Sequence, residues 1–332
     1  MVPDTVGAMR DDLLGSLSPG VILHRDAAAG GIGGHALRRA LRDGSLAQVR
    51  PGAYVRGPEW RASSPEGRQL LAVRAAARQL ADPVFSHESA AAVWGLPLVE
   101  AGGGVHVLGP PGADGRPRGT GTRAGVTRHA AGAGVTVADR DGLRLTGVLD
   151  TVLAMARDRD LRRALPVADA ALRAGLVTAD ALRVEVARRA GARGARRMRV
   201  VVALADGQAE PAGESVSRAR IHLDGYVQPA LQVPFVRGGS TVARVDFWWR
   251  DVRVVGEFDG RRKYRVDGVG DRRAVEERLW AEKRREDQVR STGARVVRWT
   301  WHEAWHPGPL SALLREAGVP RIGSPAVSRT AG

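Results

Sequence analysis

Three acidic side chains in the last third of the sequence are spaced so that they could hold a divalent cation together. They are Asp246, Glu257 and Asp259. The residues around them, 242–249 and 252–259, are rich in Val, Phe and Trp and alternate with period two, which predicts two strands. Three carboxylates on one face of an apolar hairpin repel one another and resist desolvation, so a neutralising cation is the economical arrangement.

The geometry of the predicted hairpin decides whether the three acids meet. A tight turn at residues 250–251 puts Asp246 opposite Val255, makes Glu257 its diagonal neighbour at roughly 7 Å, and leaves Asp259 on the same face. An alternative stays open, in which one acid lies at a strand end in solvent and pairs with an arginine. Mg²⁺, or Mn²⁺ in its place, would take these oxygens, bridge to a phosphodiester and activate an attacking water.

The elements that must position these acids follow in the order helix, strand, strand, helix, strand. Glu214 lies in the first turn of a helix predicted to run to about residue 225. The later helix, near residues 272–291, carries Lys283 on one stripe with acidic and aromatic residues at spacings of three and four. A last strand follows the stop signal at Gly293 and carries Arg298.

Residues 208–305 resemble the very-short-patch-repair branch of the PD-(D/E)XK endonucleases. The motifs that carry the resemblance are Val245-Asp246-Phe247, Glu257-Phe258-Asp259-Gly260, Lys263-Tyr264, Glu282-Lys283-Arg284-Arg285-Glu286-Asp287 and Gly293-Ala294-Arg295-Val296-Val297-Arg298. The resemblance implies a restriction-endonuclease-like mixed sheet flanked by helices. It also implies a catalytic set of Asp246, Glu257, Asp259, Glu214, Lys263 and Lys283, in which Asp246, Glu257 and Glu214 bind the metal and a lysine positions water or stabilises the phosphorane charge. Arg284 and Arg298 would contact DNA.

One departure from that family leaves a second interpretation open. The family places a lysine two residues after the second acid, and here that position is Asp259. Lys263 or Lys283 would have to supply the missing ammonium from a neighbouring element. If neither reaches the metal, the domain binds DNA without cutting it.

The N-terminal region predicts a winged helix-turn-helix. A glycine turn at residues 30–34 separates two short helices, and a strand pair at 46–49 and 53–55 forms the wing. In such a module the second helix enters the major groove. That helix would present Arg38, Arg39 and Arg42, with Arg50 on the wing. The alternative is a solvated helical hairpin.

The same region resembles the winged-helix domain of AbiEi-type antitoxins. The resemblance rests on the phrase Gly44-Ser45-Leu46-Ala47-Gln48-Val49-Arg50-Pro51-Gly52-Ala53-Tyr54, and it continues into their central part through Ser86-His87-Glu88-Ser89-Ala90-Ala91 and Gly95-Leu96-Pro97. It implies a DNA-binding regulator whose partner is a cognate toxin or a second copy of the chain. His87 beside Glu88 could be a catalytic pair, but capping and packing at the start of an alanine-rich helix is the commoner role.

Composition limits the classes of function. The 332 residues contain no cysteine, which excludes disulfides, thiolate zinc sites, iron–sulfur clusters and cysteine nucleophiles. The net charge of +15 suits DNA as the partner, although a general arginine bias would also produce it. No apolar run long enough to span a bilayer occurs, so we predict a cytoplasmic protein with no membrane partner. No phosphate-binding glycine loop is present, which argues against a nucleotide cofactor.

A zinc-protease motif competes with the nuclease interpretation. His302-Glu303-Ala304-Trp305-His306 matches the H-E-x-x-H pattern, which needs a helix of at least two turns. The motif follows directly on a predicted strand, and Pro307-Gly308-Pro309 ends any helix there. The sequence therefore argues against a metalloprotease.

Together these patterns predict a multi-domain α/β (α+β) chain. The expected domains are a winged helix-turn-helix at residues 1–58, a mixed central region at 59–207, a PD-(D/E)XK-like nuclease domain at 208–316 and a flexible tail at 317–332. The expected function is metal-dependent hydrolysis of DNA phosphodiesters in defence, repair or a toxin–antitoxin system. The alternative is a non-catalytic DNA-binding regulator with a degenerate nuclease fold.

Overall fold

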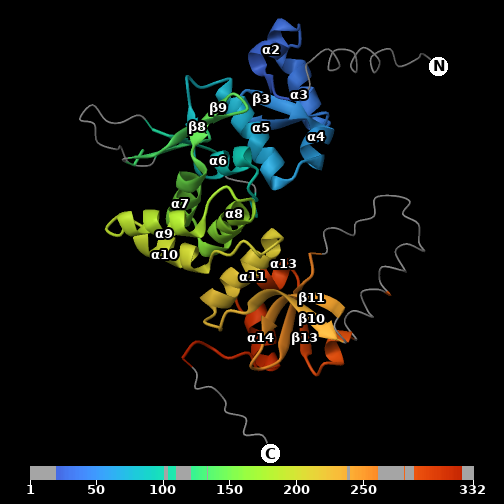
Figure 1. Ribbon diagram of the computed structural model, residues 1–332. Helices are drawn as coiled ribbons and strands as arrows, with labels where there is room; N and C mark the ends of the chain where they lie inside the picture. The colour runs from blue at the N-terminus through green and yellow to red at the C-terminus, as the bar shows by residue number, and fades with distance from the viewer. Residues whose placement is uncertain are drawn as a thin grey trace, which may run out of the picture. The chain divides into compact units, whose positions relative to one another are not determined.

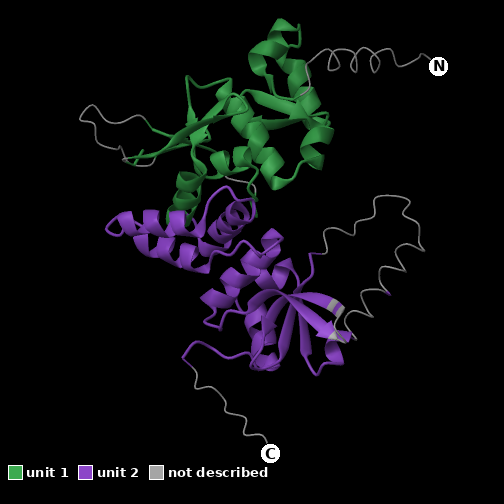
Figure 2. Cartoon of the chain, viewed as in Figure 1, with its two compact units in different colours: residues 1–158 green, residues 159–332 purple. Residues whose placement is uncertain are grey.

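The computed structural model describes residues 20–100, 104–109, 121–132, 134–237, 240–260, 280 and 288–323. Within them the chain is mixed α and β and forms three sheets, which confirms the predicted class (Figure 1). The chain divides into two compact units, Met1–Asp158 and Arg159–Gly332 (Figure 2). The division falls inside the predicted central region, so that region contributes to both units.

Unit 1 begins with two helices and a small sheet. The elements are β1 (Ile22–Leu23), α2 (His24–Ala29), α3 (Gly34–Arg42), β2 (Leu46–Arg50) and β3 (Ala53–Arg56). Antiparallel pairing gives the sheet order β1-β3-β2. Ile32, from the turn between the helices, packs with Leu37, Leu46 and Tyr54 in one buried cluster. The predicted helix, glycine turn, helix and hairpin are confirmed as elements.

A second, six-stranded sheet fills the rest of unit 1. Its strands are β4 (Val84–Phe85), β5 (Val105–Leu108), β6 (Gly121–Arg123), β7 (Val126–His129), β8 (Val137–Arg140) and β9 (Leu143–Thr146), in the order β6-β7-β5-β4-β9-β8. The helices of this part are α4 (Gly57–Ala62), α5 (Pro65–Ala77), α6 (His87–Trp94) and α7 (Val148–Asp158). Phe85, Val93, Val107 and Leu145 form the shared core, so α6 is held directly against the sheet.

Unit 2 opens with four helices. They are α8 (Leu161–Arg173), α9 (Ala179–Arg188), α10 (Ala195–Leu204) and α11 (Ala212–Leu223). A buried ion pair joins two of them, because Arg218 Nη1 lies 2.9 Å from Asp169 Oδ2. The second oxygen of Asp169 accepts a hydrogen bond from the backbone N–H of Asp206 at 2.8 Å. This pair fixes α11 against α8, and α11 carries Glu214.

The third sheet completes unit 2. Its strands are β10 (Ala230–Arg237), β11 (Ser240–Trp249), β12 (Val254–Phe258) and β13 (Arg295–Trp299), in that spatial order. The first three strands are antiparallel and β13 runs parallel to β12. The helices α13 (Trp301–Trp305) and α14 (Pro309–Ala317) follow, and α11, α13 and α14 pack on one another and on the sheet (Figure 1).

Two expectations about this sheet are wrong. The first is the number of strands between α11 and residue 260, because the sequence did not predict β10. Pro234 has no N–H to donate, which argues against a central strand, but β10 lies at the edge of the sheet, where proline is tolerated. The second is the register, because the connection is not a two-residue turn: it spans residues 250–253, and Val255 pairs with Trp248 rather than Asp246.

Candidate functional site

The register of β11 and β12 brings two predicted metal ligands closer than expected. Phe247 of β11 pairs with Gly256 of β12 in the antiparallel ladder. The next residue in the same direction is Asp246 on β11 and Glu257 on β12. Asp246 Oδ2 accepts a hydrogen bond from the backbone N–H of Phe258 at 2.9 Å. The carboxylate of Asp246 therefore reaches β12 beside Glu257, and both acids are half-buried.

A third carboxylate reaches the same region from α11. Glu214 lies in the first turn of that helix and is 3 % exposed. Its two oxygens accept hydrogen bonds from Gln232 Nε2 at 3.1 and 3.0 Å, and the backbone N–H of Glu210 donates to Oε2 at 3.1 Å. Burial, followed by the negative charge of Asp246, raises the pKa of Glu214 to about 7. Glu214 and Asp246 are thus electrostatic neighbours.

Gln232 links the helix to the sheet. It lies on β10 between Leu231, which pairs with Phe247, and Val233, which pairs with Val245, so its register position faces Asp246. Its φ of 52° is in the left-handed region, which is unusual for a residue other than glycine within a strand. The backbone is therefore strained at Gln232, whose side-chain amide donates hydrogen bonds to Glu214. Sequence reasoning missed Gln232, because the strand that carries it was itself missed.

Two glycines allow the close packing that holds these acids in place. A Cβ on Gly256 would lie 2.3 Å from Trp299 Cη2, and a Cβ on Gly213 would lie 2.0 Å from Phe258 Cε1. Trp299 also donates from Nε1 to Ser217 Oγ of α11 at 2.8 Å. α11 therefore approaches β12 closely at Gly213, next to Glu214, and Gly256, next to Glu257, makes room for the Trp299 ring of the neighbouring strand.

The remaining predicted residues of this region are only partly described. Asp259 follows the end of β12, is half-buried, and donates its backbone N–H to the carbonyl of Trp299 at 2.8 Å. Arg298 is exposed and is the register partner of Glu257 across β12 and β13. Lys263, Lys283 and Arg284 lie outside the described residues. Whether a lysine joins the acids stays a prediction.

The predicted DNA-contacting arginines lie on α3 and β2 of unit 1. Arg38, Arg39 and Arg42 are all exposed. Arg50 is half-buried, and burial lowers its pKa. Its Nε and Nη1 are shielded from solvent and have no hydrogen-bond partner among the residues that the structure describes. A guanidinium in this condition favours an anion as a partner.

The zinc-protease motif has the short helix that the sequence predicts. α13 contains five residues, and the next helix begins only at Pro309. Glu303, the residue that would act as the base, is used as a cap: Thr300 donates to Glu303 Oε2 from its N–H at 2.7 Å and from Oγ1 at 2.6 Å. These hydrogen bonds lower the pKa of Glu303. The motif is explained by helix capping.

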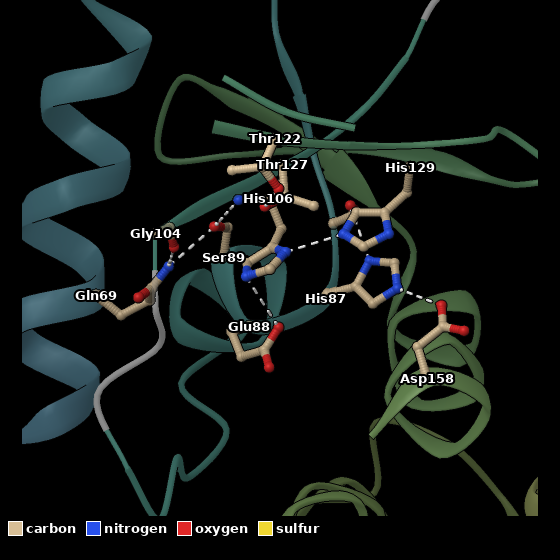
Figure 3. Close-up of polar contacts among 11 residues, drawn as sticks. Gln69, His87, Glu88, Ser89, Gly104, His106, Thr122, Thr127, His129 and Asp158 are labelled. Atoms are coloured by element: carbon tan, nitrogen blue, oxygen red, sulfur yellow. Dashed lines mark hydrogen bonds and ion pairs between the residues drawn. The ribbon is translucent and has the colours of Figure 1, made fainter. Parts of the chain in front are cut away.

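A cluster of histidines in unit 1 is the part of the molecule that sequence reasoning missed. It comprises His87, His106, His129, Glu88 and Asp158 (Figure 3). The three imidazoles are between 1 % and 7 % exposed. They come from α6, β5 and β7, and Asp158 is the last residue of α7. The His87-Glu88 dipeptide is the sequence signal for this cluster, and its pattern favours capping and packing over a functional site.

Comparison with known proteins yields partial relatives. No known protein family matches the chain by its sequence profile. Two proteins of Mycobacterium tuberculosis, the uncharacterized proteins MT2308 of strain CDC 1551 and Rv2248 of strain H37Rv, are each 35 % identical to it over 134 residues. The match covers 38 % of this chain, and the chain spans about half the length of these relatives, 49 %. They assign no function.

In the part of the chain that the structure describes, no helix combines the length and the apolar character needed to cross a bilayer.

Proposed function

We propose that this protein binds DNA and hydrolyses its phosphodiester bonds with a divalent cation held in unit 2. The observation that carries the proposal is the meeting of acids from separate elements: Glu214 of α11 lies in the field of Asp246, and Asp246 is hydrogen-bonded to β12 beside Glu257. The element order, with a helix before three antiparallel strands and a parallel fourth strand, supports the restriction-endonuclease-like fold.

The donor set fits a hard cation. Its members are carboxylate oxygens with the amide of Gln232 beside them, and oxygen donors are what Mg²⁺ and Mn²⁺ take. The pKa of Glu214, raised to about 7, indicates that a negative charge there lacks full compensation from the protein. Glu214, Asp246 and Glu257 would hold the ion. The chemistry supplied by bound Mg²⁺ is polarisation of the phosphodiester and activation of water.

The protein groups around the acids have separate roles in this proposal. Gln232 orients Glu214 through both of its oxygens, and the N–H of Phe258 fixes one oxygen of Asp246. The exposed Arg298, beside Glu257 in the ladder, would contact a phosphate of the strand that is cut. Lys263, Lys283 and Arg284 stay proposed members of the site.

Unit 1 would supply duplex binding. The two helices, the glycine turn and the hairpin have the order of a winged helix-turn-helix, and α3 presents three exposed arginines. Arg50, the last residue of β2 in the hairpin, would add a further cation for the phosphate backbone. These features support DNA as the partner, and they fit the proposed antitoxin-like origin of this region.

Plasmid cleavage tests the proposal. Purified full-length protein is mixed with supercoiled plasmid and Mg²⁺ or Mn²⁺, and nicked and linear products are measured. We expect Asp246→Asn and Glu257→Gln each to lower the cleavage rate at least about a hundredfold, since several kcal/mol of transition-state stabilisation is lost. Asp251→Asn, which neutralises an exposed acid in the turn between the same strands, is the matched control and should cleave normally.

Asp259 favours a second candidate, a DNA-binding regulator without nuclease activity, because an acid stands where the family has lysine. In that case wild-type protein would leave the plasmid intact with either cation while still retaining it in a binding assay. Equal cleavage by the wild type and Asp246→Asn would refute the proposed site itself.

A further inference from the structure

The histidine cluster of unit 1 has the donor set of a transition-metal site. One ligand atom from each of His87, His129 and Asp158 lies within 4.8 Å of the others. The rings of His87 and His129 are stacked with centroids 3.6 Å apart, and Asp158 lies beside the edge of His87 (Figure 3). Imidazole nitrogens suit zinc and its neighbours, whereas Mg²⁺ prefers oxygen, so this set differs in kind from the acids of unit 2.

The distances are close to those that a tetrahedral ion requires. Zinc bonds to nitrogen and carboxylate oxygen at about 2.0–2.2 Å, which puts two of its ligand atoms about 3.3 Å apart. His87 Nε2 and Asp158 Oδ2 are 2.9 Å apart. Opening this pair by a few tenths of an ångström, and turning the His129 ring out of its stack on His87 so that its nitrogen lone pair points to the same position, would make room for one ion.

Hydrogen bonds from the residues around the proposed ligands select suitable histidine tautomers. His106 Nε2 lies 3.5 Å from Glu88 Oε2, and its Nδ1 lies 2.9 Å from His129 Nε2. If His106 donates to the carboxylate, its Nδ1 accepts from His129 Nε2–H, which leaves the lone pair of His129 on Nδ1. Carboxylates commonly orient metal-binding histidines in this way, here through a second imidazole.

His87 is oriented by the same kind of contact. Its Nδ1 lies 3.1 Å from Ser86 Oγ, so an Nδ1–H donated to Ser86 puts the lone pair on Nε2, toward Asp158. Its φ of 52° is in the left-handed region at the start of α6. Strain of this kind persists where the surroundings fix it, and here Ser86 N–H donates to the carbonyl of His106 at 3.0 Å.

Asp158 already accepts hydrogen bonds from Arg157. In the metal-free protein it also lies within hydrogen-bond distance of His87 Nε2, and a bound metal would take the place of the proton on that nitrogen. Arg157 Nη2 and His87 Nε2 share the oxygen Oδ2. A carboxylate has lone pairs on two oxygens, which is enough for the guanidinium and a metal together.

The geometry points to a Zn²⁺-binding site in unit 1 formed by His87, His129 and Asp158. Three protein ligands leave one position for water, and Asp158, 22 % exposed, gives that position a route to solvent. The ion would join the start of α6 and the end of β7 to the end of α7. Its expected effect is to stabilise unit 1, independently of any activity of the acids in unit 2.

Zinc titration of the full chain, prepared without a polyhistidine tag and stripped with a chelator, tests this inference. Competition with a chromophoric chelator should give one zinc per chain with a dissociation constant below about 1 µM, unaffected by excess Mg²⁺. Zinc should also raise the midpoint of thermal unfolding. A wild-type chain that takes up no zinc overturns the inference.

Variants locate the ion. His129→Gln and Asp158→Asn should each weaken zinc binding at least about a hundredfold. His106→Gln should weaken it about tenfold, because His106 orients His129. The matched control is His302→Ala with His306→Ala, which removes the other adjacent histidine pair, whose rings are 4.5 Å apart. This control should keep full affinity. Undiminished binding in His129→Gln and Asp158→Asn, or loss only in the control, refutes the site.

Cobalt provides a test that does not depend on the folding of a variant. Co²⁺ bound in a four- or five-coordinate site with nitrogen ligands absorbs strongly in the visible region, whereas six-coordinate Co²⁺ absorbs weakly. Wild-type protein should show strong bands that zinc abolishes, and the His302→Ala, His306→Ala control should show the same bands. Weak bands only would overturn the inference.

Discussion

Two carboxylates, the buried Glu214 in unit 2 and the half-buried Asp158 in unit 1, have opposite surroundings. Burial and the negative charge of Asp246 raise the pKa of Glu214 to about 7, although Gln232 donates hydrogen bonds to it. Asp158 is contacted by His87 and by Arg157, and its pKa is held well below the ordinary value. In unit 2 the negative charge of Asp246 therefore disfavours ionisation of Glu214, whereas in unit 1 the guanidinium of Arg157 favours ionisation of Asp158.

This difference indicates what each region is prepared for. A cation entering unit 2 would relieve repulsion between Glu214 and Asp246, so binding would be driven by electrostatics in a site of oxygen donors. A metal entering unit 1 would have to replace hydrogen bonds that are already made, so only an ion with a strong preference for imidazole would bind there. The two regions should thus respond to different ions and to opposite changes of pH.

The largest expected effect concerns Glu214. Its folded pKa of about 7 exceeds the ordinary value of 4.5, so the carboxyl group of Glu214 keeps its proton to higher pH in the folded state than in the unfolded state. Stability is full below about pH 4.5, falls as the pH rises to about 7, and stays low above it. Glu214→Gln should therefore stabilise the metal-free protein by up to about 3 kcal/mol at pH 8 and little at pH 4. Urea unfolding at both pH values measures this. An equal gain in stability at pH 4 and pH 8 would contradict the raised pKa of Glu214.

Packing beneath the acids gives the next effect. A Cβ at Gly256 would meet Trp299 Cη2 at 2.3 Å, so Gly256→Ala should destabilise unit 2 by about 2 kcal/mol through overpacking. Gly260→Ala is the control, because its Cβ would only make an ordinary 3.5 Å contact with Phe258. Thermal unfolding measures both. Zinc binding should survive in Gly256→Ala, and its loss would show that the two regions are not independent.

Asp158 should show the opposite pH dependence to Glu214. Its folded pKa lies below the ordinary 3.8, so the stability it contributes is present above about pH 3.8 and is lost as the pH falls toward the folded pKa. Asp158→Asn should destabilise the metal-free protein by about 1–2 kcal/mol at pH 7, by loss of charge-assisted hydrogen bonds. The difference from wild type should narrow below about pH 4. Denaturant unfolding across this pH range measures the stability difference between Asp158→Asn and the wild type. A difference that does not change with pH would contradict the pairing of Asp158 with His87 and Arg157.

The smallest effect separates binding from cutting. Arg38→Gln and Arg42→Gln should each weaken DNA binding about fivefold and reduce the slope of log affinity against log salt by about 1, since each would lose one phosphate contact. Arg183→Gln, an equally exposed arginine of α9, is the control. Fluorescence anisotropy at several salt concentrations gives both quantities. An unchanged slope would remove α3 from the proposed DNA interface.

Periodicity was enough to predict the elements that carry the three acids, but not β10 or the exact strand pairing. The helix carrying Glu214 and the strands carrying Asp246 and Glu257 were predicted because their apolar patterns are strong. The register was missed because the turn at residues 250–253 is longer than two residues. The side-chain period of a strand indicates a face, while the length of the connection decides which residues meet.

The histidine cluster shows a different limit of sequence reasoning. His87, His106, His129 and Asp158 are separated by 19, 23 and 29 residues, and no local pattern links them. Their meeting depends on the order of strands in the six-stranded sheet, where β5 lies between β7 and β4. A single sequence does not reveal that order, so only tertiary structure could bring these residues together.

Pro234 on the outer strand β10 has a consequence for assembly. Another chain that extended this sheet would find no amide hydrogen to pair with at that position, so growth of a continuous intermolecular sheet is interrupted there. Pro234 therefore disfavours edge-to-edge pairing of β10 with a strand of another copy of the protein.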